Sequence, residues 1–337
     1  MRAAALRFRL PVNTWLDLST GINPHAYPVA MITQEAWHRL PEDDDDLVGV
    51  AASCYGIPDD AAILPIAGTQ AAIQSLPRLI TRLAAAGRPL QVALASLTYN
   101  EYAHAWRKVG HTVTGHTCAQ LPEAARSADV LVLCNPNNPT GARYPVAQIR
   151  RMLDALKKQR GWLIIDEAYM DATPTESIVT AVAADDWQRL IVLRSLGKFF
   201  GLAGARAGFA IGAATVIDAL RDELGPWPLS GPTRVVAARA LGDRAWQAQT
   251  RGFLLDMAAQ LNQLVRRRLH VVTSGSALFC WFEHARANAL HDHLASRAIL
   301  IRTFTARSTG GLPSVRLGLP ADHQQLARLD AALETFS

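Results

Sequence analysis

The chain has few cysteines, and their spacing narrows the class of protein. Its four cysteines, Cys54, Cys118, Cys134 and Cys280, are far apart among 337 residues and form no C-x-x-C pair. A disulfide framework and a thioredoxin-like motif are therefore both missing. We expect reduced thiols and a cytoplasmic location.

Long apolar runs are missing as well. Residues 1–7 carry no apolar segment of the kind found in a signal peptide. No uninterrupted apolar stretch is long enough to cross a bilayer. These absences predict a soluble protein that is not bound to a membrane.

The chain has few charged residues, and positive charges slightly outnumber negative ones. Charged residues make up 19% of the chain, and the formal net charge is +5. No dense Lys/Arg run is interleaved with aromatic residues, so the positive charge favours solubility or a small anionic substrate over nucleic acid. The longest acidic run, residues 42–46, has no matching ligands at a recognisable spacing, so we expect a solvated loop and no metal.

What the chain does contain is an alternation of short apolar runs and amphipathic segments. Four runs have the length and composition of buried strands: residues 90–95, 129–134, 162–166 and 190–193. Between them, residues 146–159 have the apolar spacing of a helix. Strand–helix alternation predicts an α/β fold in three layers, with a mostly parallel central sheet.

The last third of the chain has a different pattern. Prolines interrupt the alternation at 226–232, a helical region follows at 233–269, and strand-like segments come later. We expect a smaller α+β C-terminal domain. The predicted boundaries are an N-terminal arm and part of the small domain at 1–41, a large cofactor-binding domain at 42–228, and the small domain at 229–337.

The most informative stretch follows the apolar run at 190–193. It places Ser195, Lys198 and Arg206 in a glycine-rich loop. A lysine at the end of a buried strand can be desolvated and made nucleophilic toward an aldehyde, and Ser and Arg suit a phosphate. An aldehyde that carries a phosphate describes pyridoxal 5'-phosphate (PLP). The alternative for a lysine taken alone is a solvated side chain.

Two other strand ends also carry polar residues, and ligands of open α/β sheets bind at that edge. Asp166 closes the run 162–165, where a protonated pyridine nitrogen would be a suitable partner for a buried carboxylate, and Tyr169 follows one turn later. An aspartate that caps a helix is the alternative. The segment 135–141, Asn-Pro-Asn-Asn-Pro-Thr-Gly, is equally consistent with an ordinary rigid turn.

Two further features complete the predicted site. Gly68 and Thr69, with Gln70, precede a helical run at 71–83, so their amides could hold a phosphate. Tyr99 follows the strand at 90–95 and could stack on a flat cofactor, although a single tyrosine is more often a packing residue.

As a set and in this order, these residues resemble those of the fold-type I PLP enzymes, and of the class I/II aminotransferase family within them. The resemblance covers roughly residues 15–335. It implies that Lys198 binds the cofactor aldehyde, that Asp166 pairs with the pyridine nitrogen, and that Asn138 and Tyr169 donate to the phenolic oxygen. It also implies phosphate binding by Ser195, Arg206 and the Gly68–Thr69–Gln70 turn.

The same resemblance extends to the substrate. Arg316 matches an arginine that binds the substrate α-carboxylate. The segments 15–24, 197–204 and 225–232 are similar to those of decarboxylases in this family that act on a phosphorylated amino acid. By that similarity Arg302 would hold the substrate phosphate, and Asn23 is a further candidate for substrate binding. A surface salt bridge is the alternative for Arg302.

The sequence also departs from its relatives. Leu40 stands where many of them carry a tyrosine that reaches the cofactor phosphate across a dimer. The resemblance implies a homodimer. Two other functions remain open: a histidinol-phosphate-type aminotransferase, which uses the same catalytic residues, and a PLP-fold transcription regulator, which would need an N-terminal DNA-binding domain.

Overall fold

The computed structural model describes residues 1–305 and 311–336 and divides into two compact units. The large unit comprises residues 26–138 and 143–248, and the small unit comprises 1–25, 139–142 and the chain from 249 onward. Residues 26–41 and 229–248 thus group with the large unit, whereas the sequence assigned them to the arm and the small domain. The reason is packing: helix α9 (Gly231–Gly242) contacts α3 (Leu47–Tyr55) and α2 (Glu35–His38).

A seven-stranded sheet forms the centre of the large unit, in the order β2-β8-β7-β6-β5-β3-β4. The strands are β2 (Ala62–Ile66), β3 (Gln91–Ala95), β4 (Thr112–His116), β5 (Val130–Cys134), β6 (Trp162–Asp166), β7 (Leu190–Ser195) and β8 (Gly208–Gly212). All neighbouring pairs are parallel except those of β8, which runs antiparallel to β2 and β7. The prediction of a mostly parallel central sheet is confirmed.

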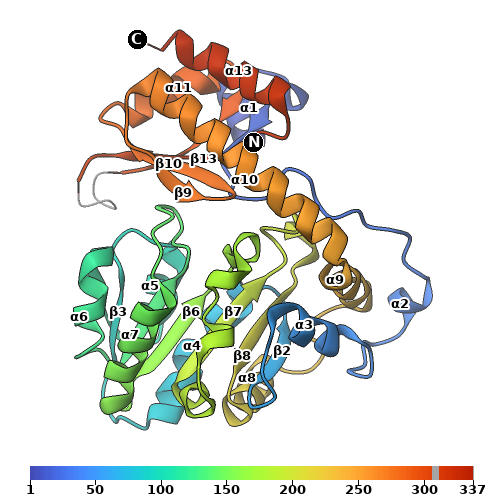
Figure 1. Ribbon diagram of the computed structural model, residues 1–337, viewed down its shortest axis with the longest axis vertical. Coiled ribbons are helices and arrows are strands. Elements are labelled where there is room, and N and C mark those ends of the chain that lie inside the picture. Colours follow the sequence, from blue (N-terminus) through green and yellow to red (C-terminus); the bar gives the residue numbers. More distant parts are fainter. Residues whose placement is uncertain (306–310, 337) are drawn as a thin grey trace. The chain divides into compact units, whose positions relative to one another are not determined.

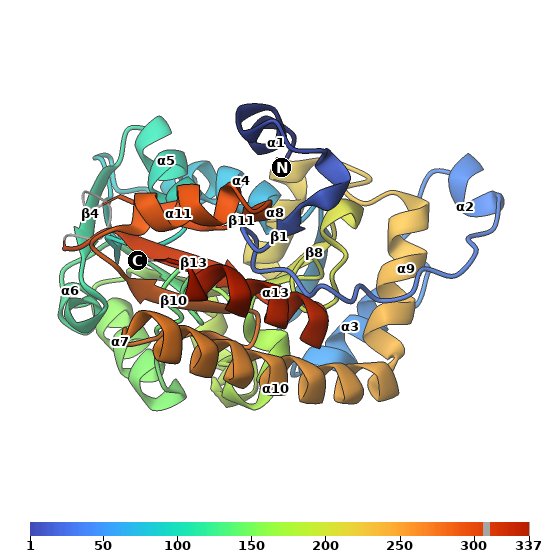
Figure 2. The same ribbon diagram turned by 90° about the horizontal axis from the view of Figure 1, so that it is seen from above.

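Helices cover both faces of this sheet. The helices of the large unit are α2, α3, α4 (Thr69–Ala84), α5 (Asn100–Lys108), α6 (Leu121–Ala124), α7 (Val146–Lys158), α8 (Ala214–Leu224) and α9. Of these, α2 packs on α9 and lies away from the sheet (Figure 1). Figure 2 shows α4, α5 and α8 on one side of the sheet and α3 and α7 on the other. Helix α7 buries Ile149, Met152, Leu153 and Leu156, as its apolar spacing predicts. Strands β5, β6 and β7 are buried along their whole length because both faces are covered.

The small unit contains a four-stranded antiparallel sheet in the order β12-β13-β10-β9 and a parallel pair, β1 and β11. Its strands are β1 (Leu16–Asp17), β9 (Ser274–Ser276), β10 (Phe279–Glu283), β11 (Ile299–Leu300), β12 (Arg302–Phe304) and β13 (Ser314–Gly318). Its helices include α1 (Arg2–Phe8), α11 (Ala287–Ala295) and α13 (His323–Glu334). Figure 1 shows α11 and α13 on one face of the antiparallel sheet. The predicted α+β character of the C-terminal region is confirmed.

The helical region predicted at 233–269 is two helices, α9 and α10 (Arg244–Leu269). They are separated by Asp243, which ends α9 and whose carboxylate accepts a hydrogen bond from the Trp246 backbone N–H at 2.9 Å. This bond satisfies one of the unpaired amides at the start of α10.

Residues 1–25 belong to the small unit and contribute several side chains to its core. Strand β1 pairs in register with β11, and Ala5 and Trp15 pack in one buried cluster with Ala295 and Ala298. Within the described parts of the chain, we find no helix both long and apolar enough for a membrane span.

Candidate active site

A pocket in the large unit lies at the carboxyl ends of the sheet strands. We call it the strand-end pocket. It is lined by Gly68, Thr69, Gln70, Tyr99, Tyr102, Cys134, Asn138, Asp166, Ala168, Tyr169, Ser195, Gly197, Lys198, Ala203 and Arg206. Every residue that the sequence predicted to be catalytic or cofactor-binding is in this set. The parallel strands bring them together because Cys134, Asp166 and Leu193 are aligned across β5, β6 and β7.

Asp166 is the buried carboxylate of the pocket, and its side chain is fixed at both oxygens. It is only 4% exposed. Its Oδ2 accepts a hydrogen bond from the Tyr102 hydroxyl at 2.7 Å, and its Oδ1 accepts one from the Ala168 backbone N–H at 2.9 Å. Burial raises the pKa of Asp166, while these two donors and the charge of Lys198 act to lower it. The Oδ1 of Asp166 thus accepts a hydrogen bond from a residue of the turn that follows, and the carboxylate lines the pocket.

Lys198 shares the pocket with Asp166. Its Nζ lies 5.7 Å from the centroid of the Tyr169 ring. The loop that carries it is held by the fully buried Phe199 and by a hydrogen bond from the Gly197 N–H to the Ser195 Oγ at 3.2 Å. Lys198 is half-buried, which distinguishes it from a solvated surface lysine.

The opposite end of the pocket suits an anion. Gly68 precedes α4 with φ +73° and ψ 160°, a conformation that essentially only glycine adopts. A Cβ at Gly68 would lie 2.9 Å from Arg206 Nη2. Among the described residues, no side chain caps α4, so the amides of its first turn face the pocket together with Ser195 and Arg206. Helix N-terminal amides beside an arginine are a phosphate-binding arrangement.

The turn that carries Asn138 is built by its two neighbouring asparagines. Asn137 accepts a hydrogen bond from the Thr98 hydroxyl at 2.7 Å and donates one to the Leu97 carbonyl at 2.9 Å. Asn135 accepts one from the Tyr144 N–H at 3.0 Å. Because Asn135 and Asn137 are buried and anchored, Asn138 is held at the pocket wall.

The sequence did not identify Tyr102 and Cys134 as parts of the pocket. Tyr102 lies three residues after Tyr99 on the same helix face, and their rings meet edge to face at 5.5 Å. The Tyr99 hydroxyl donates to Gln70 Oε1 at 3.1 Å. Burial raises the pKa of the Cys134 thiol to about 12, so it is neutral and weakly nucleophilic at neutral pH.

The predicted substrate-binding residues belong to the small unit. Arg302 on β12 and Arg316 on β13 are direct cross-strand partners. Partners in an antiparallel pair share one face of the sheet, and like charges there are destabilising. Arg316 donates to the Ser19 carbonyl at 2.8 Å, while the Arg302 guanidinium carbon lies 5.8 Å from the Phe304 ring centroid. Two guanidinium groups on one face can bind two anionic groups of one ligand.

Asn23 lies in the same unit and is 3% exposed. Its Oδ1 accepts a hydrogen bond from the His25 N–H at 2.9 Å. The bond fixes the local turn at this position. The role of Asn23 in substrate binding stays a prediction.

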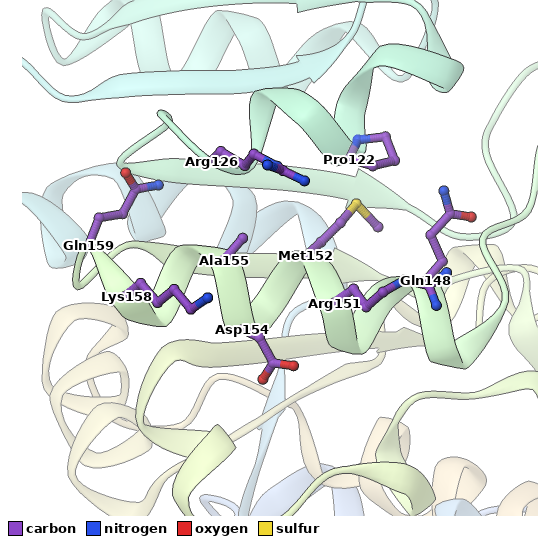
Figure 3. A pocket seen from close by; sticks show the side chains of 9 residues that line it. All are labelled: Pro122, Arg126, Gln148, Arg151, Met152, Asp154, Ala155, Lys158 and Gln159. Atoms are coloured by element: carbon purple, nitrogen blue, oxygen red, sulfur yellow. The ribbon is translucent and has the colours of Figure 1, made fainter.

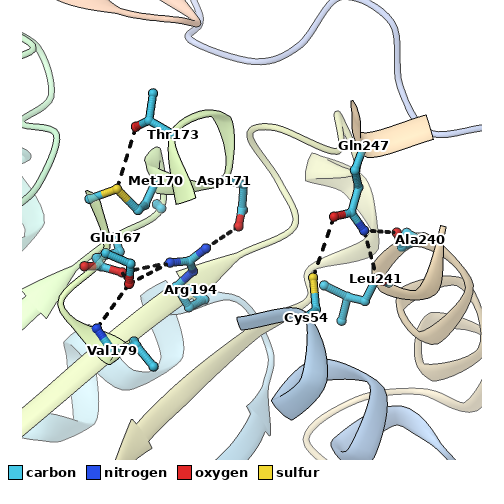
Figure 4. A network of polar contacts seen from close by, with 12 residues as sticks. Cys54, Glu167, Met170, Asp171, Thr173, Val179, Arg194, Ala240, Leu241 and Gln247 are labelled. Atoms are coloured by element: carbon cyan, nitrogen blue, oxygen red, sulfur yellow. Dashed lines mark hydrogen bonds and ion pairs between the residues drawn. The ribbon is translucent and has the colours of Figure 1, made fainter. Parts of the chain in front are cut away.

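A buried ion network lies behind the strand-end pocket (Figure 4). Arg194 donates to Glu167 Oε2 at 2.8 Å and to Asp171 Oδ1 at 2.5 Å, and all three side chains are at most 4% exposed. Burial acts to lower the pKa of Arg194, but the negative charges of Asp171 and Glu167 have the larger effect and raise that pKa. The network ties Arg194, which precedes Ser195 in β7, to Glu167 and Asp171, which follow Asp166 at the end of β6.

A second hollow lies on the surface of α6 and α7 (Figure 3). Its basic residues are Arg126, Arg151 and Lys158, and Asp154 is beside them. Arg126 is exposed and paired with Glu123. None of the residues predicted to be functional lines this hollow, so the strand-end pocket is the candidate active site.

Comparison with known proteins agrees with this geometry. Residues 46–335 match the model of the aminotransferase class I and II family, and the chain belongs to this family. A threonine-phosphate decarboxylase from Pseudomonas aeruginosa is 46% identical over all of this chain and 96% of its own length. Another, from a Sinorhizobium species, is 37% identical over 98% of this chain and 95% of its own length.

A solved structure shares the fold. The histidinol-phosphate aminotransferase from Sinorhizobium meliloti, in complex with pyridoxal-5'-phosphate, superposes with a TM-score of 0.82. The match covers 99% of this chain and 93% of that chain, at 19% sequence identity. This likeness confirms the predicted three-layer α/β fold.

Proposed function

We propose that the protein is a PLP-dependent carboxy-lyase that converts L-threonine O-3-phosphate to (R)-1-amino-2-propanol O-2-phosphate and CO2. The product is the aminopropanol linker used in cobalamin biosynthesis. The observation that carries the proposal is the strand-end pocket, which joins Lys198, a buried Asp166 and a helix N-terminus in one cavity. The full-length similarity to two threonine-phosphate decarboxylases supports the choice of reaction.

The residues present fit PLP at both ends of the pocket. Asp166 is a buried carboxylate that would face the pyridine nitrogen, and the amides after Gly68, with Ser195 and Arg206, would bind the phosphate. Lys198 supplies the amine for the aldehyde. When bound, PLP would serve as the electron sink for the pair of electrons left by the broken Cα–carboxylate bond.

The two cross-strand arginines would orient the substrate. Arg316 would bind the α-carboxylate and Arg302 the phosphate, and two anchored groups fix the rotation of the Cα–carboxylate bond. After CO2 leaves, Lys198 would deliver a proton to Cα. The bond lost is Cα–C and the bond gained is Cα–H, and the electron pair of the broken bond forms the new one. The proton that Lys198 would deliver is replaced from water, so the reaction takes up one proton and needs no oxidant, reductant or second substrate.

We also infer a cytoplasmic homodimer. Residues 26–41 expose several large apolar side chains, including Met31 at 92% and Trp37 at 67%. Exposed apolar surface of this kind is typical of an interface. A second copy of the chain would cover it.

The decisive experiment supplies L-threonine O-3-phosphate and PLP without any 2-oxo acid and measures CO2 and the amine product. We expect stoichiometric release of both. A strict requirement for 2-oxoglutarate would instead identify a histidinol-phosphate-type aminotransferase. Lys198→Ala should abolish turnover and the visible absorbance band that depends on the bond between Lys198 and the cofactor, whereas Lys158→Ala, at the exposed hollow on α7, should change neither.

A further inference from the structure

Tyr102 is a buried tyrosine in the wall of the strand-end pocket. It is 3% exposed, and its hydroxyl donates to Asp166 Oδ2 at 2.7 Å. The phenol comes from α5, whereas the carboxylate comes from the end of β6. This hydrogen bond therefore links helix α5 to the end of strand β6.

That bond has a specific consequence for Asp166. A carboxylate in a buried site tends to take up a proton, and a neutral acid cannot pair with a pyridinium. The Tyr102 hydroxyl stabilises the ionised form by donating to it. It also fixes the rotation of the carboxylate, because Ala168 N–H holds the other oxygen at 2.9 Å.

We infer that Tyr102 is a positioning residue that keeps Asp166 ionised and oriented toward the cofactor's pyridine nitrogen. This inference rests on the proposed PLP site. Four other groups act on the same carboxylate or border it: Lys198, Glu167, the Ala168 amide and the neutral Cys134 thiol. Lys198 and Ala168 also favour the anion, Glu167 opposes it, and Tyr102 is the only hydroxyl among the groups named here.

The test measures binding of pyridoxine 5'-phosphate by calorimetry. This probe has the ring and the phosphate but no aldehyde, so bond formation with Lys198 does not enter. Tyr102→Phe removes only the hydroxyl, and we expect about tenfold weaker binding near pH 8, since a hydrogen bond to a charged group is lost. The loss should grow near pH 6, because without its donor the pKa of Asp166 rises and the carboxylate protonates more readily.

Two controls separate this role from a general packing defect. Tyr55→Phe removes another buried tyrosine hydroxyl, outside the pocket-lining set, and should change affinity less than twofold. In an Asp166→Asn background, Tyr102→Phe should have almost no further effect, because the carboxylate whose ionised form Tyr102 stabilises is gone. Circular dichroism and thermal unfolding establish that each variant is folded.

The outcomes are distinct. A loss below twofold, a loss that is equal at both pH values, or a loss that persists in the Asp166→Asn background would each overturn the role of Tyr102. If the unmodified protein fails to bind pyridoxine 5'-phosphate at all, the proposed function itself is wrong. Normal binding by the unmodified protein and by Tyr102→Phe would refute only the positioning role.

Discussion

Replacing Arg194 by methionine tests how much the buried ion network stabilises the fold. Methionine keeps most of the volume of the side chain but removes the charge and both of its carboxylate contacts. Glu167 and Asp171 would then be buried without their shared cation. Breaking a buried ion pair in this way costs about 3–5 kcal/mol.

The local contacts place the expected loss near the lower end of that range. Glu167 keeps hydrogen bonds from the Ser177 hydroxyl at 2.6 Å and the Ile178 N–H at 3.0 Å. Asp171 loses a contact of 2.5 Å in a site where it is 4% exposed. We therefore expect Arg194→Met to lower the free energy of unfolding by about 3 kcal/mol.

Urea unfolding at neutral pH, followed by circular dichroism, measures this loss. Arg88→Met is the matched control, because Arg88 also makes two carboxylate bonds, to Asp129 at 2.7 and 2.8 Å, but is 54% exposed. Solvent screens an exposed ion pair, so we expect Arg88→Met to change the free energy of unfolding much less than Arg194→Met. A loss below about 1 kcal/mol for Arg194→Met, or one equal to that of Arg88→Met, would refute the reasoning.

Three further predictions concern the anion end of the pocket, the substrate and acid stability. Gly68→Ala should weaken PLP binding at least about tenfold, because the added Cβ meets Arg206 and because alanine in this backbone conformation costs on the order of 1–3 kcal/mol. Unchanged affinity in a PLP titration would contradict this prediction. Arg302→Ser should lower kcat/KM for L-threonine O-3-phosphate by the factor that corresponds to a loss of about 2–4 kcal/mol in transition-state binding. The Tm of the unliganded protein should stay unchanged or rise, because the repulsion between Arg302 and Arg316 is relieved, and a lower Tm would argue against that repulsion. Hydrogen bonds from arginines hold the pKa values of Asp129 and Asp330 below their unfolded values. The two ionised carboxylates therefore stabilise the folded protein fully above about pH 4, and this stabilisation is lost as the pH falls through their lower folded pKa values. A midpoint of urea unfolding that stays constant from pH 6 to pH 2 would contradict the prediction.

The sequence could predict which residues line the strand-end pocket because they follow the ends of buried strands. Asp166 and Lys198 come directly after buried apolar runs, and parallel strands bring such positions to one edge. The sequence did not predict three strands of the large sheet, β2, β4 and β8. Pro65 lies within β2 and glycines bound β8, while β4 is mostly exposed and polar, so none of the three has the unbroken apolar pattern of a buried strand.

Tyr102 was missed for a different reason. Its residue type and helical position are those of an ordinary core aromatic, and only the distance from its hydroxyl to Asp166 gives it a role. The grouping of residues 26–41 with the large unit likewise depends on packing against α9, a contact distant in sequence. Contacts of this kind are set by tertiary structure and leave no local pattern.

Consecutive residues at two strand ends face opposite sides of the sheet. Asp166 and Ser195 line the pocket, whereas their neighbours Glu167 and Arg194 meet in the ion network. Side chains alternate along a strand, so a slip of one residue would exchange the two sets. A single-residue insertion or deletion in β6 or β7 would carry a network residue into the cofactor site and a cofactor ligand into the core. The lengths of β6 and β7 therefore decide which side chains reach the pocket and which reach the ion network.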